Sequence, residues 1–132
     1  MARPRHPNPT PAEFEILEFI WHHGPSTVRD VMTGLEEQHP RAYTSVMSLM
    51  NVMVEKKLLT RNPQGRAYVY ESRVSRAKTR SRMLKDMVSR VFDGSAGALV
   101  MRLLRDAAPT EEELADISKA VAEFRKKEEG GE

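Results

Sequence analysis

The sequence predicts a mainly α-helical protein that contains one β-hairpin, and three observations lead to this fold class. Three segments before residue 60 and three after residue 73 repeat apolar residues with helical spacing. Between them, residues 60–72 read TRNPQGRAYVYES, a group of turn-forming residues followed by a strand pattern. Helix-breaking residues separate the segments, as at residues 24–25 and 93–94. The order of three helices and then a hairpin is that of a winged helix-turn-helix domain.

The first helix is expected to begin at Thr10 and to end near residues 23–25. The tetrapeptide TPAE supplies an N-cap, a proline at the first helical position and a glutamate for a capping box. Its predicted core stripe is Phe14, Leu17, Ile20 and Trp21. A second helix should follow a cap at Ser26 or Thr27 and continue to a break at residues 39–40. Its apolar residues are Val28, Val31, Met32 and Leu35.

The third helix is predicted from the segment AYTSVMSLMNVMVEKKLL, residues 42–59, and it has two distinct faces. At about 100° per residue, one face is Val46, Leu49, Met50 and Met53. The opposite face is Thr44, Ser48, Asn51 and Glu55. We expect the first face to pack and the second to be free to read DNA bases. The hairpin follows at once, with residues 62–65 as its predicted turn and Arg61 and Arg66 flanking the tip.

Three further amphipathic helices are expected over residues 74–92, 95–106 and from 110 onward, where Thr110 and Glu113 form another capping box. Their apolar faces need a surface to bury against, which favours a homodimer over helices that fold back on their own domain. The predicted dimerisation residues are Met87, Val91, Leu99, Leu103, Leu114, Ile117, Val121 and Phe124. The expected division is a disordered basic arm at 1–9, a winged domain at 10–72, a dimerisation domain at 73–127 and a flexible tail at 128–132.

The charge distribution favours a polyanionic partner. The net charge is only +2, but residues 41–90 contain 12 Lys or Arg against 3 Asp or Glu, whereas residues 107–132 contain 4 against 8. Clustered positive charge favours nucleic acid because each phosphate contact releases condensed counterions. The alternative interpretation of such a cluster is a solvated helix surface.

The composition excludes most enzymatic and membrane functions. The chain has no cysteine, and its four histidines lack the spacing of a metal site. It has no glycine-rich phosphate loop, so we expect no enzyme, no metal and no cofactor. No apolar run approaches the roughly 20 residues of a membrane span, and the N-terminus lacks the apolar segment of a secretory signal. These features are consistent with a cytoplasmic protein.

The predicted DNA-contacting residues belong to the third helix and the hairpin. Asn51 can bridge adenine, and Met47, Val52 and the methyl of Thr44 can contact thymine, so we expect direct readout of A·T pairs. Residues near the helix start are placed for phosphates, and the hairpin arginines are placed for phosphate or the minor groove. The predicted set is Arg41, Tyr43, Thr44, Ser45, Ser48, Asn51, Arg61 and Arg66.

The chain resembles the penicillinase-repressor family, the BlaI/MecI/CopY-type bacterial repressors, over nearly its whole length. The resemblance rests on the order and spacing of five strings. These are TPAEFEILEFIW (10–21), VRDV (28–31), AYTSVMSLMN (42–51), EKKLL (55–59) and GRAYVY (65–70). It departs from the family at two positions, where Val52 replaces a frequent arginine and Lys57 replaces a frequent glycine at the end of the third helix. A non-glycine residue in a left-handed cap costs about 1 kcal/mol, so a rearranged helix end is expected.

The resemblance implies a homodimeric winged-helix repressor that binds a two-fold symmetric operator and dimerises through its C-terminal helices. It also implies induction by a sensor-linked protease that detects β-lactam and causes cleavage in the C-terminal region. The matching position here is Arg102-Leu103, which differs from the family's usual Asn-Phe pair. The family's copper-responsive branch uses a C-terminal cysteine cluster, which this chain lacks, so we do not expect it to belong to that branch. The rival to a DNA-binding repressor is a winged protein-interaction module that docks an acidic partner through the same basic surface.

Overall fold

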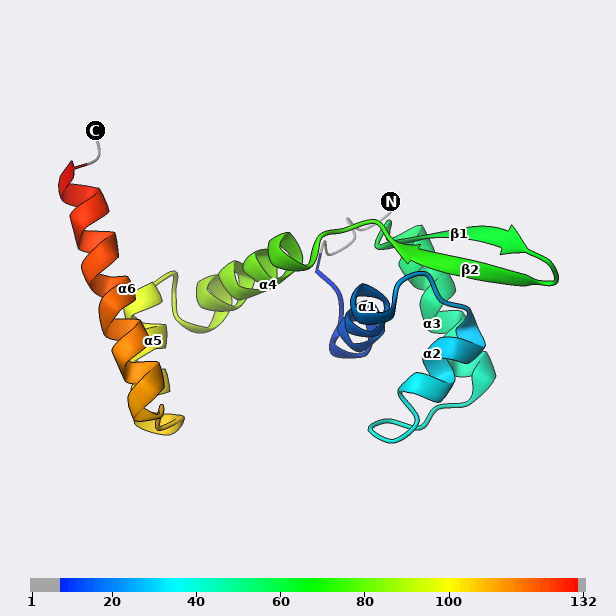
Figure 1. Cartoon of the computed structure of the whole chain (residues 1–132), viewed down its shortest axis with the longest axis horizontal. Helices are drawn as coiled ribbons and strands as arrows, with labels where there is room; N and C mark the ends of the chain where they lie inside the picture. Colours follow the sequence, from blue (N-terminus) through cyan, green and yellow to red (C-terminus); the bar gives the residue numbers. More distant parts are fainter. Residues whose placement is uncertain (1–7, 131–132) are drawn as a thin grey trace. The chain divides into compact units, whose positions relative to one another are not determined.

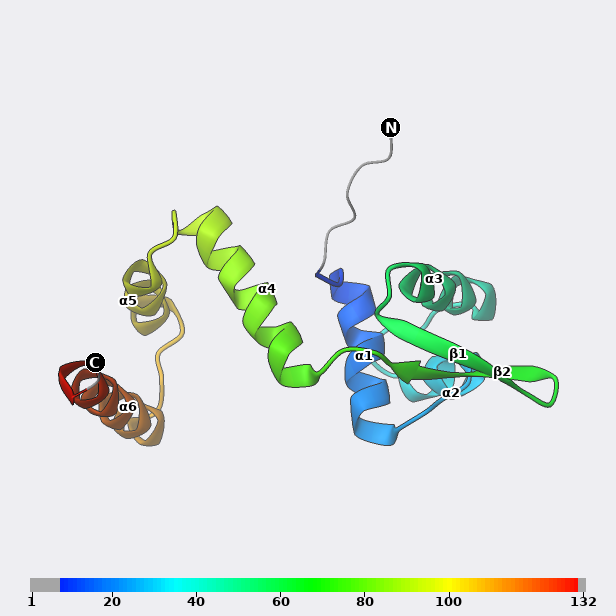
Figure 2. The same cartoon turned by 90° about the horizontal axis from the view of Figure 1, so that it is seen from above.

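A computed structural model describes residues 8–130 of the chain (Figures 1 and 2). The elements follow in the order α1 (Pro11–His23), α2 (Val28–Gly34), α3 (Tyr43–Glu55), β1 (Leu59–Gln64), β2 (Ala67–Ser72), α4 (Arg76–Val91), α5 (Ala96–Asp106) and α6 (Glu111–Gly130). The chain divides into two compact units, Met1–Leu84 and Lys85–Glu132, so the first unit extends into α4, beyond the expected boundary at residue 72. The predicted fold class, mainly helical with a winged helix-turn-helix domain and C-terminal helices, is confirmed.

The start of α1 is capped as the sequence predicted. The Thr10 hydroxyl accepts a hydrogen bond from the Glu13 amide at 3.2 Å, and the Glu13 carboxylate accepts one from the Thr10 amide at 2.9 Å. Asn8 and Pro9, which the sequence predicts as part of the basic arm, are both buried immediately before this helix start. Residues 1–7 of that arm lie outside the described residues.

The capping glutamate of α1 also binds the end of α3. The Lys56 Nζ donates to Glu13 Oε1 at 2.7 Å, and the two side chains are only 14% and 4% exposed. Breaking such a buried pair leaves one charge without compensation in a medium of low dielectric constant. The pair therefore holds α1 and α3 together.

The second helix is shorter than predicted. It is capped by Thr27 and Asp30, but it ends at Gly34 rather than near residue 39. Residues 36–38 are polar and exposed, so extending the helix would bury nothing. Gly34 lies against Phe19, where an added Cβ would meet the ring, so a larger residue would force the Phe19 side chain to move.

The end of α3 keeps a left-handed residue without glycine. Lys57 has φ +67°, its amide donates to the Val54 carbonyl, and the Leu58 amide donates to the Met53 carbonyl. This pair of bonds is the Schellman arrangement, and both Leu58 and Met53 are buried beside it. The expected rearrangement of the helix end is therefore wrong, because this cap is maintained by the burial of its apolar pair.

The hairpin is longer than predicted and its turn is shorter. Gln64 pairs with Ala67, so the turn consists of Gly65 and Arg66 alone, and residues 62–64 continue β1. Gly65 has φ +64°, which suits a two-residue turn with glycine at its first central position. Pro63 is tolerated because a strand of a two-stranded sheet has a free edge.

The core of the first unit joins all three helices to the base of the hairpin. Tyr70 is 1% exposed, and its backbone pairs with Ser26 ahead of α2. Trp21, predicted as core, is only partly buried, and its indole N–H donates to Ser72 Oγ and the Val74 carbonyl. The buried apolar residues are Ile16, Leu17, Ile20, Val28, Val31, Val46, Met50, Met53, Leu58, Leu59 and Tyr70.

The C-terminal helices have the predicted boundaries to within two residues, except at the end. Ser95 caps α5, Thr110 and Glu113 form the expected capping box of α6, and the break before α5 has positive φ at Asp93 and Gly94. Residues 128–130, which the sequence predicts as part of the flexible tail, continue α6, and charged residues with good helix propensity precede Gly130. Residues 131–132 lie outside the described part of the chain.

Candidate nucleic-acid interface

The polar face of α3 is presented to solvent as predicted. Thr44, Ser45 and Ser48 are exposed, and Val52 is 40% exposed on the same side. The opposite face is held by Val46, Met50 and Met53 in the core, so the helix cannot rotate without unpacking the domain. The helix contains no Lys or Arg, and its exposed hydrogen-bonding groups are mainly hydroxyls.

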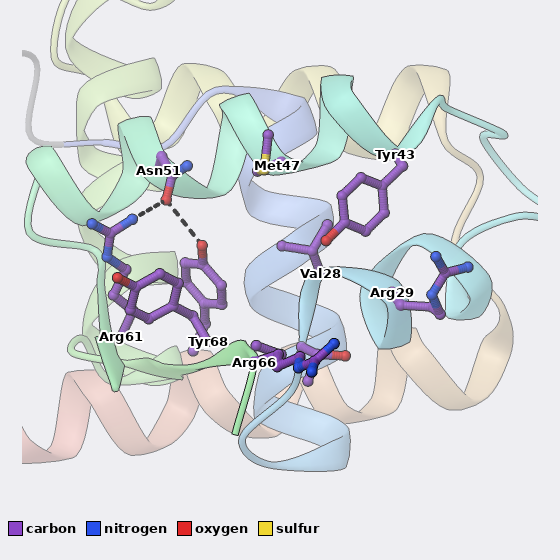
Figure 3. Close-up of a pocket in the computed structure, with 11 residues that line it drawn as sticks. Val28, Arg29, Tyr43, Met47, Asn51, Arg61, Arg66 and Tyr68 are labelled. Atoms are coloured by element: carbon purple, nitrogen blue, oxygen red, sulfur yellow. Dashed lines mark hydrogen bonds between the residues drawn. The ribbon is translucent and has the colours of Figure 1, made fainter. Parts of the chain in front are cut away.

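Asn51, which we predicted to bridge adenine, is bound within the domain. Its Oδ1 accepts a hydrogen bond from Arg61 Nη1 at 2.7 Å and another from the Tyr70 hydroxyl at 2.9 Å (Figure 3). A carbonyl oxygen has two lone pairs, and both are occupied here. A bidentate adenine contact would therefore require one of these bonds to break, which counts against that predicted role.

Arg61 lies beside α3 rather than at the tip of the hairpin. Its guanidinium carbon is 4.4 Å from the centre of the Tyr68 ring, which is 44% exposed. This distance is within the range of a cation–π interaction. Tyr68 and Tyr70 lie on one face of β2, but Tyr70 is over the core whereas Tyr68 extends past it, so their burial differs.

A groove of about 430 Å³ lies between α3, the start of α2 and the hairpin (Figure 3). Three arginines line it, Arg29, Arg61 and Arg66, together with exposed Tyr43 and Tyr68, and among residues 8–130 no acidic residue lines it. The groove is therefore strongly positive, which suits a phosphate backbone.

Sequence reasoning missed Arg29. Its guanidinium carbon lies 5.4 Å from the centre of the Tyr43 ring, across from α3. Its position two residues after the Thr27 cap could have identified it as a groove residue. In a helix-turn-helix, the start of the second helix lies beside the third helix. The basic segment predicted from the sequence also left it out, since that segment began at residue 41.

Arg41 is less available for phosphate than we predicted. Its Nη1 lies 3.2 Å from Glu15 Oε1, and its side chain is 22% exposed. The other oxygen of Glu15 lies 2.8 Å from His39 Nδ1. Arg41 therefore contributes to the connection between α1 and the segment before α3, and the structure does not bring it to the groove.

The predicted dimerisation residues of the second unit are largely exposed. No residue of α5 or α6 is buried, and the apolar residues on these helices include Phe124 at 63% exposed. Met87 and Val91 on α4 and Leu103, Leu114, Ile117 and Val121 are exposed as well, whereas Leu99 is half-buried. The predicted cleavage pair lies inside α5, where Arg102 is paired with Asp106 at 3.8 Å.

The described residues offer no sign of a metal centre. Among residues 8–130, no group of three His, Cys, Asp or Glu side chains is arranged to hold an ion. Within the same residues, no helix combines the length and the apolar character of a membrane span.

Comparison with known proteins identifies relatives along almost the whole chain. The penicillinase repressor of Bacillus licheniformis is 21% identical over 124 residues, covering 92% of this chain and 97% of that protein. The solution structure of the DNA-binding domain of the repressor BlaI is similar with a TM-score of 0.50 at 20% identity, covering 57% of this chain and 92% of that one.

A solution structure of monomeric Bacillus licheniformis BlaI with the blaP half-operator matches with a TM-score of 0.46 and 20% identity, over 56% of this chain and 87% of that one. The penicillinase repressor family model matches residues 9–123, which include the winged domain and most of the C-terminal helices. The chain therefore belongs to the penicillinase repressor family of transcriptional regulators.

Proposed function

We propose that this protein is a transcriptional repressor that binds a two-fold symmetric DNA operator as a homodimer. In this proposal α3 enters the major groove, and the groove lined by Arg29, Arg61 and Arg66 receives the adjacent phosphate backbone. The observation that carries the proposal is the combination of an exposed hydroxyl-rich helix face with an arginine-lined groove that no carboxylate of the described residues lines. An acidic protein partner would also suit the arginines, but it would not need the small hydrogen-bonding residues on α3.

The homodimer is supported by the second unit. Leu114, Ile117, Val121 and Phe124 recur along α6 with spacings of three and four residues, and all of them are exposed in one chain. An apolar stripe of this kind is normally buried against a partner helix. A second copy of the same stripe is the economical partner, because a two-fold axis then relates the two reading domains as it relates two operator halves.

The relationship to a penicillinase repressor supports a proposal about the regulated genes. We propose control of β-lactam resistance or stress genes, with release from DNA when the chain is cut by a sensor-linked protease. Two linked domains bind two half-sites with a high effective concentration, so separation of the reading domain from α6 lowers affinity without altering α3. Cleavage within residues 92–109, which include Arg102-Leu103, has this effect.

The test begins with mapping of the DNA that the full-length protein binds across its genome. Symmetric sites are expected, including one near the chain's own gene. Gel-shift titration then compares the full chain with a fragment that ends at Asp93 on one such site. The fragment should be monomeric and bind far more weakly. Equal affinity would show that the C-terminal helices do not hold two reading domains on DNA, and absence of any enriched site would favour the protein-interaction module.

A further inference from the structure

The polar face of α3, which includes Thr44, Ser48, Asn51 and Glu55 and is the face proposed to read DNA, has no positively charged side chain of its own. Its sequence, YTSVMSLMNVMVE, contains no Lys or Arg, and its exposed residues supply hydroxyls, apolar groups and the Glu55 carboxylate. Two parallel N–H donors are what recognises guanine through its O6 and N7 atoms, and an arginine usually supplies them. The side chains of α3 therefore cannot supply this two-donor contact to guanine.

The hairpin brings an arginine to this face. Asn51 lies at the edge of the polar face, because steps of about 100° place Thr44 on one side of it and the half-buried Met47 on the other. The Arg61 guanidinium donates to Asn51 Oδ1 at 2.7 Å, so it reaches the reading face from β1 (Figure 3). The ring of Tyr68, 4.4 Å away, contacts the same guanidinium.

These two contacts fix the position of Arg61 before DNA is present. The bond to Asn51 uses Nη1, and the Nε and Nη2 donors form a second parallel pair on the other edge of the guanidinium. A planar group held against a ring and an amide loses less side-chain entropy on binding than a free arginine. Arg66, in contrast, lies exposed in the two-residue turn at the tip of the hairpin.

Asn51 is itself fixed by the core. The hydroxyl of Tyr70 donates to the same Oδ1 at 2.9 Å, and Tyr70 is 1% exposed. The two donors determine the orientation of the amide, because the opposite orientation would direct its NH2 group at both of them. Asn51 is therefore suited to hold Arg61 rather than to contact a base itself.

We propose that Arg61 is a specificity-determining residue that reads a guanine in each operator half through Nε and Nη2, and that Asn51 is its positioning residue. This rests on the proposed function, since it requires α3 in the major groove. From the sequence, we predicted direct readout of A·T pairs alone. With Arg61 as a base-contacting residue, the readout also includes a G·C pair, which the hairpin contacts.

The experiment is selection of duplexes from a random library by the full-length protein and four variants. Arg61→Ala and Asn51→Ala should both lose the guanine preference at the same symmetric position, with discrimination reduced roughly 5- to 150-fold. Arg66→Ala should weaken binding on all sequences and keep the motif. Asn51→Asp keeps an acceptor for Arg61 but cannot donate to adenine N7, so it should retain the guanine preference despite weaker overall binding.

Two outcomes overturn the proposal. If the Arg61→Ala variant selects duplexes with the same motif as the wild type, but binds fewer of them, Arg61 contacts phosphate and does not read a base. If Asn51→Ala loses an adenine elsewhere in the motif and keeps the guanine, Asn51 reads its own base. Thermal unfolding of each variant identifies any that does not fold, and Asn51→Leu, which also removes the acceptor for Arg61, then carries the test in place of Asn51→Ala. A wild-type protein that enriches no symmetric motif refutes the proposed function itself, whereas a motif without guanine refutes only the role of Arg61.

Discussion

Replacing Lys57 by glycine should stabilise the winged domain. Lys57 has φ +67° at the Schellman end of α3, and its side chain is exposed. The left-handed region costs a residue with a Cβ about 1–2 kcal/mol, and glycine avoids this cost. Glycine also makes the unfolded chain more flexible, which costs about 0.4–1 kcal/mol of stability. The difference favours Lys57→Gly by about 0.5–1 kcal/mol, since the cap geometry is already the one that glycine prefers.

A gain of this size is measurable. For a domain of roughly 60–100 residues it corresponds to a rise in the midpoint of thermal unfolding of about 2–8 °C. Trp21 is the single tryptophan and lies against β2 and the residues after it, so its fluorescence reports unfolding of this domain. All variants are compared as full chains at one protein concentration, because association changes apparent stability.

The matched control is Lys57→Ala, which removes the same charge and keeps the Cβ. Its midpoint should stay near that of the wild type. If Lys57→Gly has an unchanged or lower midpoint, the left-handed residue is not under strain. If Lys57→Ala gains as much as Lys57→Gly, the removed charge and not the backbone is the cause.

Three further predictions concern the ion pair, the dimer and the hairpin. Lys56→Met should lower the free energy of unfolding by about 3 kcal/mol, because it leaves Glu13 buried without its partner. Adding Glu13→Gln should restore part of this loss, and strictly additive losses would argue against coupling of the pair. Ile117→Asp with Val121→Asp should yield monomers in sedimentation, and a wild type that is already monomeric at micromolar concentration would contradict the proposed dimer. Arg66→Ala should reduce the log–log slope of DNA affinity against salt by roughly 0.9 for each phosphate that the arginine neutralises, on any sequence. An unchanged slope would remove Arg66 from the interface.

Signals that act within one turn of helix were predictable from the sequence. The caps at Thr10, Thr27 and Thr110 depend on residues three positions apart, so no tertiary information was needed. The polar face of α3 was predictable for the same reason, since periodicity alone separates it from Val46, Met50 and Met53.

What was missed depends on contacts between distant segments. The group Asn-Pro-Gln-Gly at residues 62–65 is turn-forming throughout, and the true turn at Gly65 and Arg66 is consistent with the register in which Tyr70 is buried and pairs with Ser26. The bonds that occupy Asn51 come from residues 10 and 19 positions away, on β1 and β2 respectively. No periodicity within α3 contains that information.

Glu13 binds both the start of α1 and the end of α3, so it links the opening of these two helix ends, which open independently in most helical proteins. The first turn of a helix ordinarily frays on its own, so its amides exchange with solvent faster than those of the core. Here one carboxylate oxygen bonds both the Thr10 amide and Lys56, which is 43 residues from Glu13 in the sequence, so opening the first turn of α1 also releases the end of α3. Hydrogen exchange at this helix start should therefore be slow and should follow unfolding of the whole domain.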